Sequence, residues 1–179
     1  MSSVETASAA RTSPFWTFSL GYYRGTGVSE ACLELQDNCG VDVNVVLFLL
    51  WQASQRRSVA PGDVTALADR VRPWQMDVIG PIRSVRRRLK TDAPLLERGA
   101  AELFRTKIKA IELEAERLQQ EAMQALAASL RTAPAETVEA AARASLAAYA
   151  ATLGRTFTKA AVDTMIAALH DDNGNRGTR

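Results

Sequence analysis

The chain has 179 residues, a formal net charge of +2 and 47% hydrophobic residues, which suits one domain with a buried core. Residues 1–13 are small and polar, and no apolar segment follows them, which argues against a signal peptide. The longest apolar run, Val43 to Trp51, is about half the length that crosses a bilayer. We therefore expect a soluble, cytoplasmic protein that does not bind a membrane.

Composition and charge distribution refine this picture. Alanine, leucine, arginine and glutamate are abundant and glycine and proline are sparse, which favours an all-α fold. Residues 1–55 carry a net charge of −3, residues 56–90 carry +6, and the remainder carries −1. The middle of the chain is therefore the cationic part, and local charge matters more than the total.

The first predicted elements are short helices. Residues 1–12 predict a disordered leader. An aromatic-rich helix follows, with Ser13 as its N-cap and Pro14 in its first turn. A second helix over 28–39 ends at Gly40, placed as a left-handed C-terminal glycine.

The third predicted helix covers residues 43–58, with Asp42 as its N-cap. Its first turns are apolar nearly all round, which is typical of a buried helix. We expect it to lie at the centre of the protein, with the other helices packed around it.

Two helices are predicted in the cationic part. One begins at Pro61 or Asp63 and is interrupted by Pro73. The next covers residues 74–90, with a kink at Pro81. Its apolar positions share one face. They are Val78, Ile82, Val85 and Leu89.

The last part predicts long helices. A helix over 94–130 has apolar residues alternating by four and three, as in a coiled coil, and an alanine-rich helix covers 136–153. These two predict an antiparallel hairpin. A final helix over 156–170 precedes a polar tail at 171–179, predicted to be disordered. The apolar residues of the long helix are Phe104, Ile108, Ile111, Ala115, Leu118, Ala122 and Ala125.

The predicted fold is therefore a compact multi-helix bundle with a long C-terminal helical hairpin. Residues 13–91 form a compact helical module, because nearly all the aromatic residues precede residue 91 and alanine dominates after it. Residues 92–170 form the hairpin extension and the final helix. The hairpin either folds back on the module or pairs with a partner helix or a second copy.

Chemistry-bearing residues are sparse. Cys32 and Cys39 are the only cysteines, and without a CxxC pattern they are expected to be reduced thiols. The single histidine, His170, lies near the end of the chain. The sequence has no histidine-based triad, glycine-rich phosphate loop or HExxH motif, so we assign no catalytic residue, metal ligand or cofactor.

The first candidate site is a basic helix face, Arg83, Arg86, Arg87 and Lys90, with Arg88 on another side of the same helix. Three interpretations remain open. The cations either lie in solvent near a helix C-terminus, bind RNA or DNA, or dock to an acidic protein surface.

The second candidate is a polar elbow between the second and third helices. It contains Gln36, Asp37, Asn38, Asp42 and Asn44. These residues either cap helix ends or form a small polar pocket. The two carboxylates suit a divalent cation better than an anion, but two acids alone are a weak magnesium site.

The sequence resembles a bacterial family of short proteins known as domain of unknown function 2390. The motifs are FWxFSLxxY from Phe15, ACLxLQD from Ala31, and GxDVNxxLFxLW from Gly40. The later residues that fit are Trp74, Arg83, Arg87, Arg88, Leu89 and Lys90. The resemblance implies a small all-helical bacterial cytosolic protein and no particular activity.

We expect a non-catalytic helical interaction or adaptor protein. The main alternative is nucleic-acid binding through the basic face between Arg83 and Lys90. A weaker alternative is a small-molecule or metal-dependent enzyme at the elbow between Gln36 and Asn44.

Overall fold

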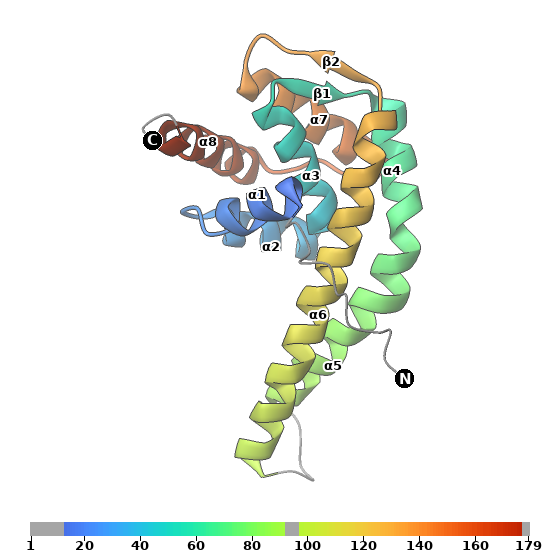
Figure 1. Cartoon of the computed structure of the whole chain (residues 1–179), viewed down its shortest axis with the longest axis vertical. Coiled ribbons are helices and arrows are strands. Elements are labelled where there is room, and N and C mark those ends of the chain that lie inside the picture. The colour runs from blue at the N-terminus through green and yellow to red at the C-terminus, as the bar shows by residue number, and fades with distance from the viewer. Residues whose placement is uncertain (1–12, 92–96, 177–179) are drawn as a thin grey trace, which may run out of the picture.

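α3 (Val43–Ser54) lies at the centre of the protein in the computed structural model, which describes residues 13–91 and 97–176. Leu49, Leu50 and most of the other side chains of α3 are buried, and five other helices pack around it (Figure 1). The predicted central helix and the all-α fold class are confirmed. The predicted leader, residues 1–12, lies outside the described residues.

The N-terminal helices begin and end where the sequence predicts. α1 (Pro14–Tyr22) has Ser13 as its N-cap, and the Ser13 hydroxyl accepts a hydrogen bond from the Trp16 amide. α2 (Val28–Cys39) ends at Gly40, whose φ of 68° lies in the left-handed region that glycine adopts without strain. Local sequence therefore determines these ends.

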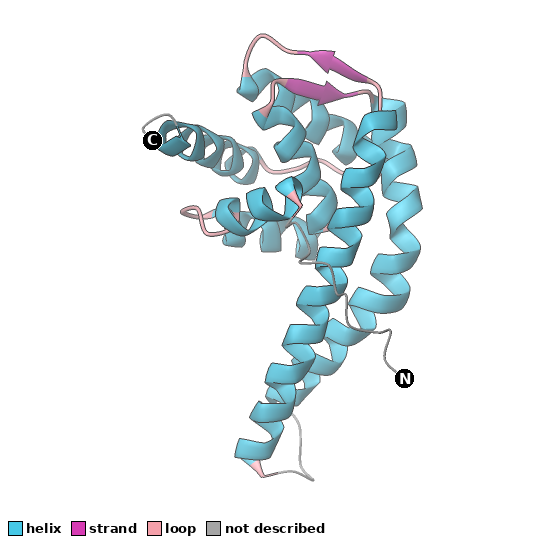
Figure 2. Ribbon diagram, viewed as in Figure 1, coloured by secondary structure: helices cyan, strands magenta, loops and turns pink. Residues whose placement is uncertain are grey.

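A two-stranded antiparallel sheet, which the sequence analysis did not predict, closes one end of the molecule (Figure 2). β1 (Arg57–Val59) pairs with β2 (Thr132–Pro134). The predicted third helix therefore ends at Ser54 and not at residue 58. The Val59 amide donates to the Ser145 hydroxyl at 3.1 Å. The backbone of β1 therefore has hydrogen-bond partners along both of its edges.

The helix break predicted at Pro73 is wrong. α4 (Pro61–Trp74) continues through it into a π-helical segment (Gln75–Ile79) and then into α5 (Gly80–Thr91). The Gly80 amide donates to the Gln75 carbonyl, five residues earlier, which is the widened bonding of a π-turn. The chain therefore changes its helical geometry near its prolines without leaving the helix.

The predicted hairpin between residues 94–130 and 136–153 is also corrected. α6 (Arg98–Leu126), which ends in a 3₁₀ turn (Ala127–Ser129), packs along α5. α7 (Val138–Thr152) packs on α3 and α4. β2 connects α6 to α7 across the end of the molecule, so α7 packs on α3 and not beside α6. The protruding hairpin is therefore made of α5 and α6 (Figure 1).

The buried face of α6 differs from the predicted coiled-coil seam. Phe104, Ile111 and Leu118 are 47%, 52% and 43% exposed. Glu112 and Met123 are among the buried residues of α6 instead. Ala115 is the residue of the predicted seam that is buried. The helix is turned so that polar residues also face the protein, because α3 and α5 present polar partners there.

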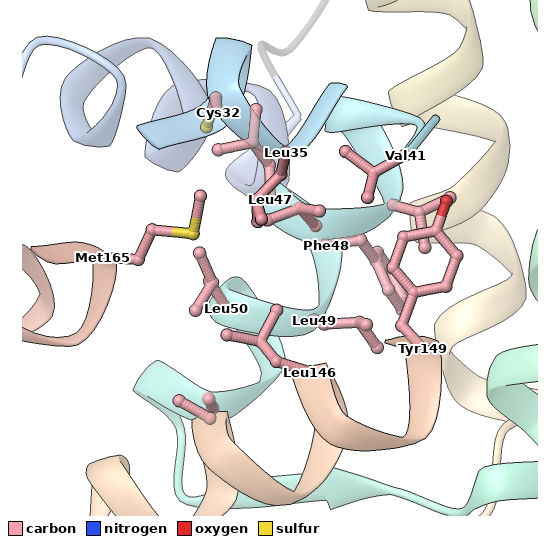
Figure 3. Packing of buried hydrophobic residues seen from close by; sticks show 14 of the residues in the cluster. Cys32, Leu35, Val41, Leu47, Phe48, Leu49, Leu50, Leu146, Tyr149 and Met165 are labelled. Carbon is pink, nitrogen blue, oxygen red and sulfur yellow. The ribbon is translucent and has the colours of Figure 1, made fainter. Parts of the chain in front are cut away.

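α8 (Lys159–Arg176) packs mainly on α2, and the Tyr22 hydroxyl donates to the Met165 carbonyl. The helix continues to Arg176, past the predicted start of the tail at residue 171. Buried residues on both sides of residue 91 contribute to one core around α3 (Figure 3). The division into a module and an extension stays a prediction.

Within the described ranges, no helix combines the length and the apolar character that crossing a membrane requires.

The central position of α3 predicts that truncating a buried leucine costs much more unfolding free energy than truncating an exposed one. Leu50→Ala should lower the free energy of unfolding by about 2–5 kcal/mol, because it leaves a cavity beneath five packed elements. Leu103→Ala, at a side chain that is 71% exposed, should change it by less than about 0.5 kcal/mol. Urea unfolding followed by circular dichroism measures both values. Equal effects would contradict the assignment of α3 as the core helix.

Candidate binding pocket

A pocket of about 400 Å³ lies where α1, α2 and the N-terminus of α3 face the α5–α6 hairpin. Both candidate sites from the sequence meet at this pocket. The predicted residues that line it are Gln36, Asp42, Asn44, Arg83, Arg86 and Arg87. The other predicted residues are exposed and do not line it: Asp37, Asn38, Arg88 and Lys90.

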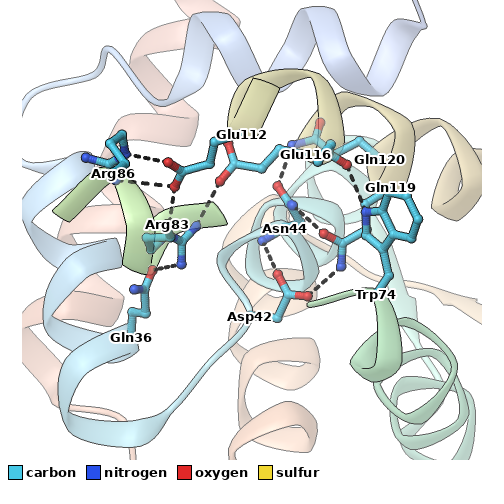
Figure 4. Close-up of polar contacts among 11 residues, drawn as sticks. Gln36, Asp42, Asn44, Trp74, Arg83, Arg86, Glu112, Glu116, Gln119 and Gln120 are labelled. Atoms are coloured by element: carbon cyan, nitrogen blue, oxygen red, sulfur yellow. Dashed lines mark hydrogen bonds and ion pairs between the residues drawn. The ribbon is translucent and has the colours of Figure 1, made fainter. Parts of the chain in front are cut away.

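Arg83 joins three helices at the wall of the pocket (Figure 4). Its guanidinium donates to Glu112 Oε1 at 2.9 Å and to Glu116 Oε1 at 2.8 Å, both on α6. It also donates to Gln36 Oε1 on α2 at 3.2 Å. The arginine side chain is only 17% exposed, so it connects α2, α5 and α6 and is not a solvated cation.

Arg86, one turn further along α5, pairs with the second oxygen of Glu112. Burial by itself would raise the pKa of Glu112, but the hydrogen bonds from Arg86 and Arg83 outweigh it and lower that pKa. The hydrogen bond to Glu112 likewise raises the pKa of Arg86. One buried carboxylate therefore balances two arginines of the predicted basic face.

Glu116 has the opposite shift. Burial raises its pKa, and the neighbouring charge of Glu112 adds to the rise, while Arg83 lowers it. Two acidic side chains thus share Arg83, and the one with fewer arginine partners is the more readily protonated. The pocket wall contains both a firmly ionised carboxylate and a more basic one.

Asp42 begins a chain of buried hydrogen bonds. As the predicted N-cap of α3, it accepts from the Asn44 amide at 2.9 Å, and its other oxygen accepts from Gln119 Nε2 at 2.6 Å. Its own amide donates to the Tyr149 hydroxyl at 2.9 Å. Burial raises the pKa of Asp42, and the hydrogen bond from Gln119 works against that rise.

The chain continues through side-chain amides in one direction (Figure 4). Gln119 Oε1 accepts from Asn44 Nδ2 at 2.7 Å, and Asn44 Oδ1 accepts from Gln120 Nε2 at 2.8 Å. An ionised Asp42 can only accept, so it orients each amide in turn. The last oxygen, Gln120 Oε1, is left as an acceptor.

Two buried side-chain atoms of the described residues have no hydrogen-bond partner, and both belong to residues that line this pocket. They are Gln120 Oε1 and Ser19 Oγ. Buried polar atoms are rarely left unpaired, because an unpaired one costs about 1–3 kcal/mol. Both atoms are closed off from solvent, so they lie behind the surface of the pocket and are not open to a ligand.

The remaining wall is apolar and cationic. Arg24, Arg87 and Lys109 line the pocket and form no ion pair among the described residues. Trp16 and Leu33 are among its apolar residues. A ligand that combines negative charge with an apolar group fits this lining.

Sequence analysis missed the acidic and amide residues that α6 supplies, Glu112, Glu116, Gln119 and Gln120. These residues recur at helical spacing, which was a usable signal. It was overlooked because the apolar row of the same helix was assigned to the core. A polar row is buried only where another element presents polar partners, and α3 and α5 present them here.

The described residues contain no group of three or more histidine, cysteine, aspartate or glutamate side chains placed to hold a metal ion.

The double pairing of Glu112 predicts a pH-dependent stability. Glu112→Gln should lower the free energy of unfolding at pH 7 by about 1–3 kcal/mol, because two arginines lose the charge that balances them. The folded-state pKa lies below the unfolded one, so the contribution is present above about pH 4.3 and is lost as the pH falls through the folded value.

Thermal unfolding of both proteins between neutral and acid pH measures the effect. The difference between wild type and Glu112→Gln should shrink on acidification. Glu114→Gln, which removes a surface partner of Arg117, is the matched control and should leave the melting temperature nearly unchanged. A difference that stays constant down to acid pH would contradict the role assigned to the Glu112 charge.

Comparison with known proteins places this chain in a family. A family model described as "Protein of unknown function (DUF2390)" matches residues 14–123, more than half of the chain. The matched span includes every residue that lines the pocket, from Trp16 to Gln120. Searches of curated proteins and of solved structures find no match. The chain belongs to the DUF2390 family, as its N-terminal motifs predicted.

Proposed function

We propose that this protein is a non-catalytic interaction module of the bacterial cytoplasm, and that its pocket binds a short acidic segment of a partner protein. The observation that carries the proposal is the lining of the pocket, where Arg24, Arg87 and Lys109, unpaired among the described residues, lie beside apolar side chains such as Leu33. An acidic segment with an apolar side chain complements both parts of this lining.

Charge favours an acidic segment. Five cationic and three acidic side chains line the pocket, a surplus of two positive charges. Glu112 and Glu116 are already paired with Arg83 and Arg86. The cations that remain for a ligand are Arg24, Arg87 and Lys109, and clustered cations of this kind attract carboxylates.

The apolar wall favours a segment with one or more apolar side chains. Leu20 and Leu33 line the pocket and are 38% and 44% exposed. Covering them removes apolar surface from water, at about 25 cal/mol per Å². An acidic residue next to an aliphatic or aromatic one meets both requirements.

Nucleic-acid binding is the second candidate. Arg87, Arg88 and Lys90 are exposed near the C-terminal end of α5, which favours contact with phosphates. Arg83 and Arg86 are already paired with Glu112 and are not available to phosphates. The apolar side chains of the pocket also give a phosphate backbone no complementary group. We therefore rank the acidic segment first.

The cytoplasmic placement is part of the proposal and is supported by the thiols. Cys32 and Cys39 are both free, and Cys32 is buried. Free thiols are usual in a reducing compartment. Burial raises the pKa of Cys32 to about 12, so this thiol stays protonated and unreactive at neutral pH.

Two neighbouring arginines separate the candidates. Random peptides displayed on phage and selected on the full chain should become enriched in aspartate and glutamate beside apolar residues. Arg87→Glu, at the pocket, should weaken a selected peptide at least about tenfold. Arg88→Glu, on the same helix outside the pocket, should leave it unchanged, as measured by fluorescence anisotropy.

A fluorescein-labelled RNA or DNA oligonucleotide at low salt gives the opposing result. Binding that Arg88→Glu and Arg87→Glu weaken equally, together with no enrichment of acidic peptides, would overturn the first proposal in favour of the second. Circular dichroism of both variants checks that they fold as the wild type does.

A further inference from the structure

The outward face of α6 presents a row of apolar side chains away from the pocket. Phe104, Ile111 and Leu118 recur every seven residues, and the structure leaves each of them about half exposed. The row spans about 21 Å at 1.5 Å per residue. Rows of large exposed apolar side chains are uncommon on monomeric proteins and mark interaction surfaces.

This face is separate from the pocket. Leu113, two residues after Ile111, points to the opposite side of the helix and lines the pocket instead. α6 packs against α5, α1, α3, α4 and the π-helical segment, and about half of each side chain in the row stays exposed beside those contacts. A partner bound to the row would therefore leave the pocket open.

The row is self-complementary when a second α6 runs in the opposite direction. With Ile111 opposite its own copy, Phe104 faces Leu118 of the second molecule, and Leu118 faces its Phe104. One apolar row therefore fills both sides of the contact.

The charges beside the row match in the same arrangement. Lys107 precedes Ile111 by four residues and Glu114 follows it by three, and both are exposed. In the antiparallel pair each Lys107 lies next to Glu114 of the second molecule. Lys107 has no ion-pair partner among the described residues, while Glu114 pairs only with Arg117. In a parallel pair the two copies of each charged residue lie on opposite sides of the contact, so Lys107 does not meet Glu114.

We propose that the outward face of α6 binds a second copy of this chain, antiparallel, with the two-fold axis at Ile111. The contact is one helix wide, which places it among small interfaces. A dissociation constant on the order of 10 µM is expected, so the dimer forms and dissociates readily. Each dimer would carry two pockets, one on each copy.

Sedimentation equilibrium of the full chain tests the proposal directly. The wild type should shift from monomer to dimer as its concentration rises through the expected dissociation constant. Ile111→Glu places two like charges on the axis and should leave only monomer. Leu113→Glu, an equally drastic change at a similarly exposed leucine on the pocket side, should still dimerise.

A charge exchange tests the direction of the pairing. Lys107→Glu and Glu114→Lys should each weaken the dimer at least about tenfold, and the protein with both changes should recover it. Parallel pairing would leave both single variants nearly unaffected, because the two copies of each charged residue then lie on opposite sides of the contact. A wild type that stays monomeric at about 0.1 mM, or dimers that Ile111→Glu does not disrupt, would overturn the proposal.

Discussion

The N-terminus of α3 sets the main constraint on this structure. The helix is buried, so its polar first residues, Asp42 and Asn44, need partners inside the protein. Those partners, Gln119 and Gln120, come from α6 and lie at least 75 residues later in the chain. The need to pair them turns the polar row of α6 inward and its apolar row outward. The position and the rotation of the long helix both follow from one polar helix end.

Arg83 extends the same network into the hairpin. Its contacts with α6 and α2 hold the hairpin beside the N-terminal helices. The hydrogen bond from Trp74 Nε1 to the Ala115 carbonyl at 3.0 Å joins the end of α4 to α6. The pocket is the space that this arrangement leaves between the hairpin and the N-terminal helices. Two arginines of the predicted basic face, Arg83 and Arg86, therefore connect helices and do not lie free in solvent. Only the cations beyond Arg83 and Arg86 remain for a ligand.

The family match and the folded core have different limits. The matched span ends at Met123, so it includes the pocket and all of α3 but neither α7 nor α8. Buried residues of those helices, among them Leu146, Tyr149 and Met165, cover α3 (Figure 3). The Tyr149 hydroxyl also accepts a hydrogen bond from the Asp42 amide. In this chain the C-terminal helices therefore complete the core that supports the site.

Local sequence determined the helical class, the caps at Ser13 and Asp42, the left-handed Gly40 and the burial of α3, because each depends on neighbouring residues or on one helical period. It also indicated six of the residues that line the pocket. Only the tertiary structure decided which face of α6 is buried, since its apolar and polar rows have equally regular spacing. The choice depends on the polar groups of α3 and α5 that α6 meets. The packing of α7 on α3 follows a strand pair of three residues on each side, which is too short to leave a periodic signal.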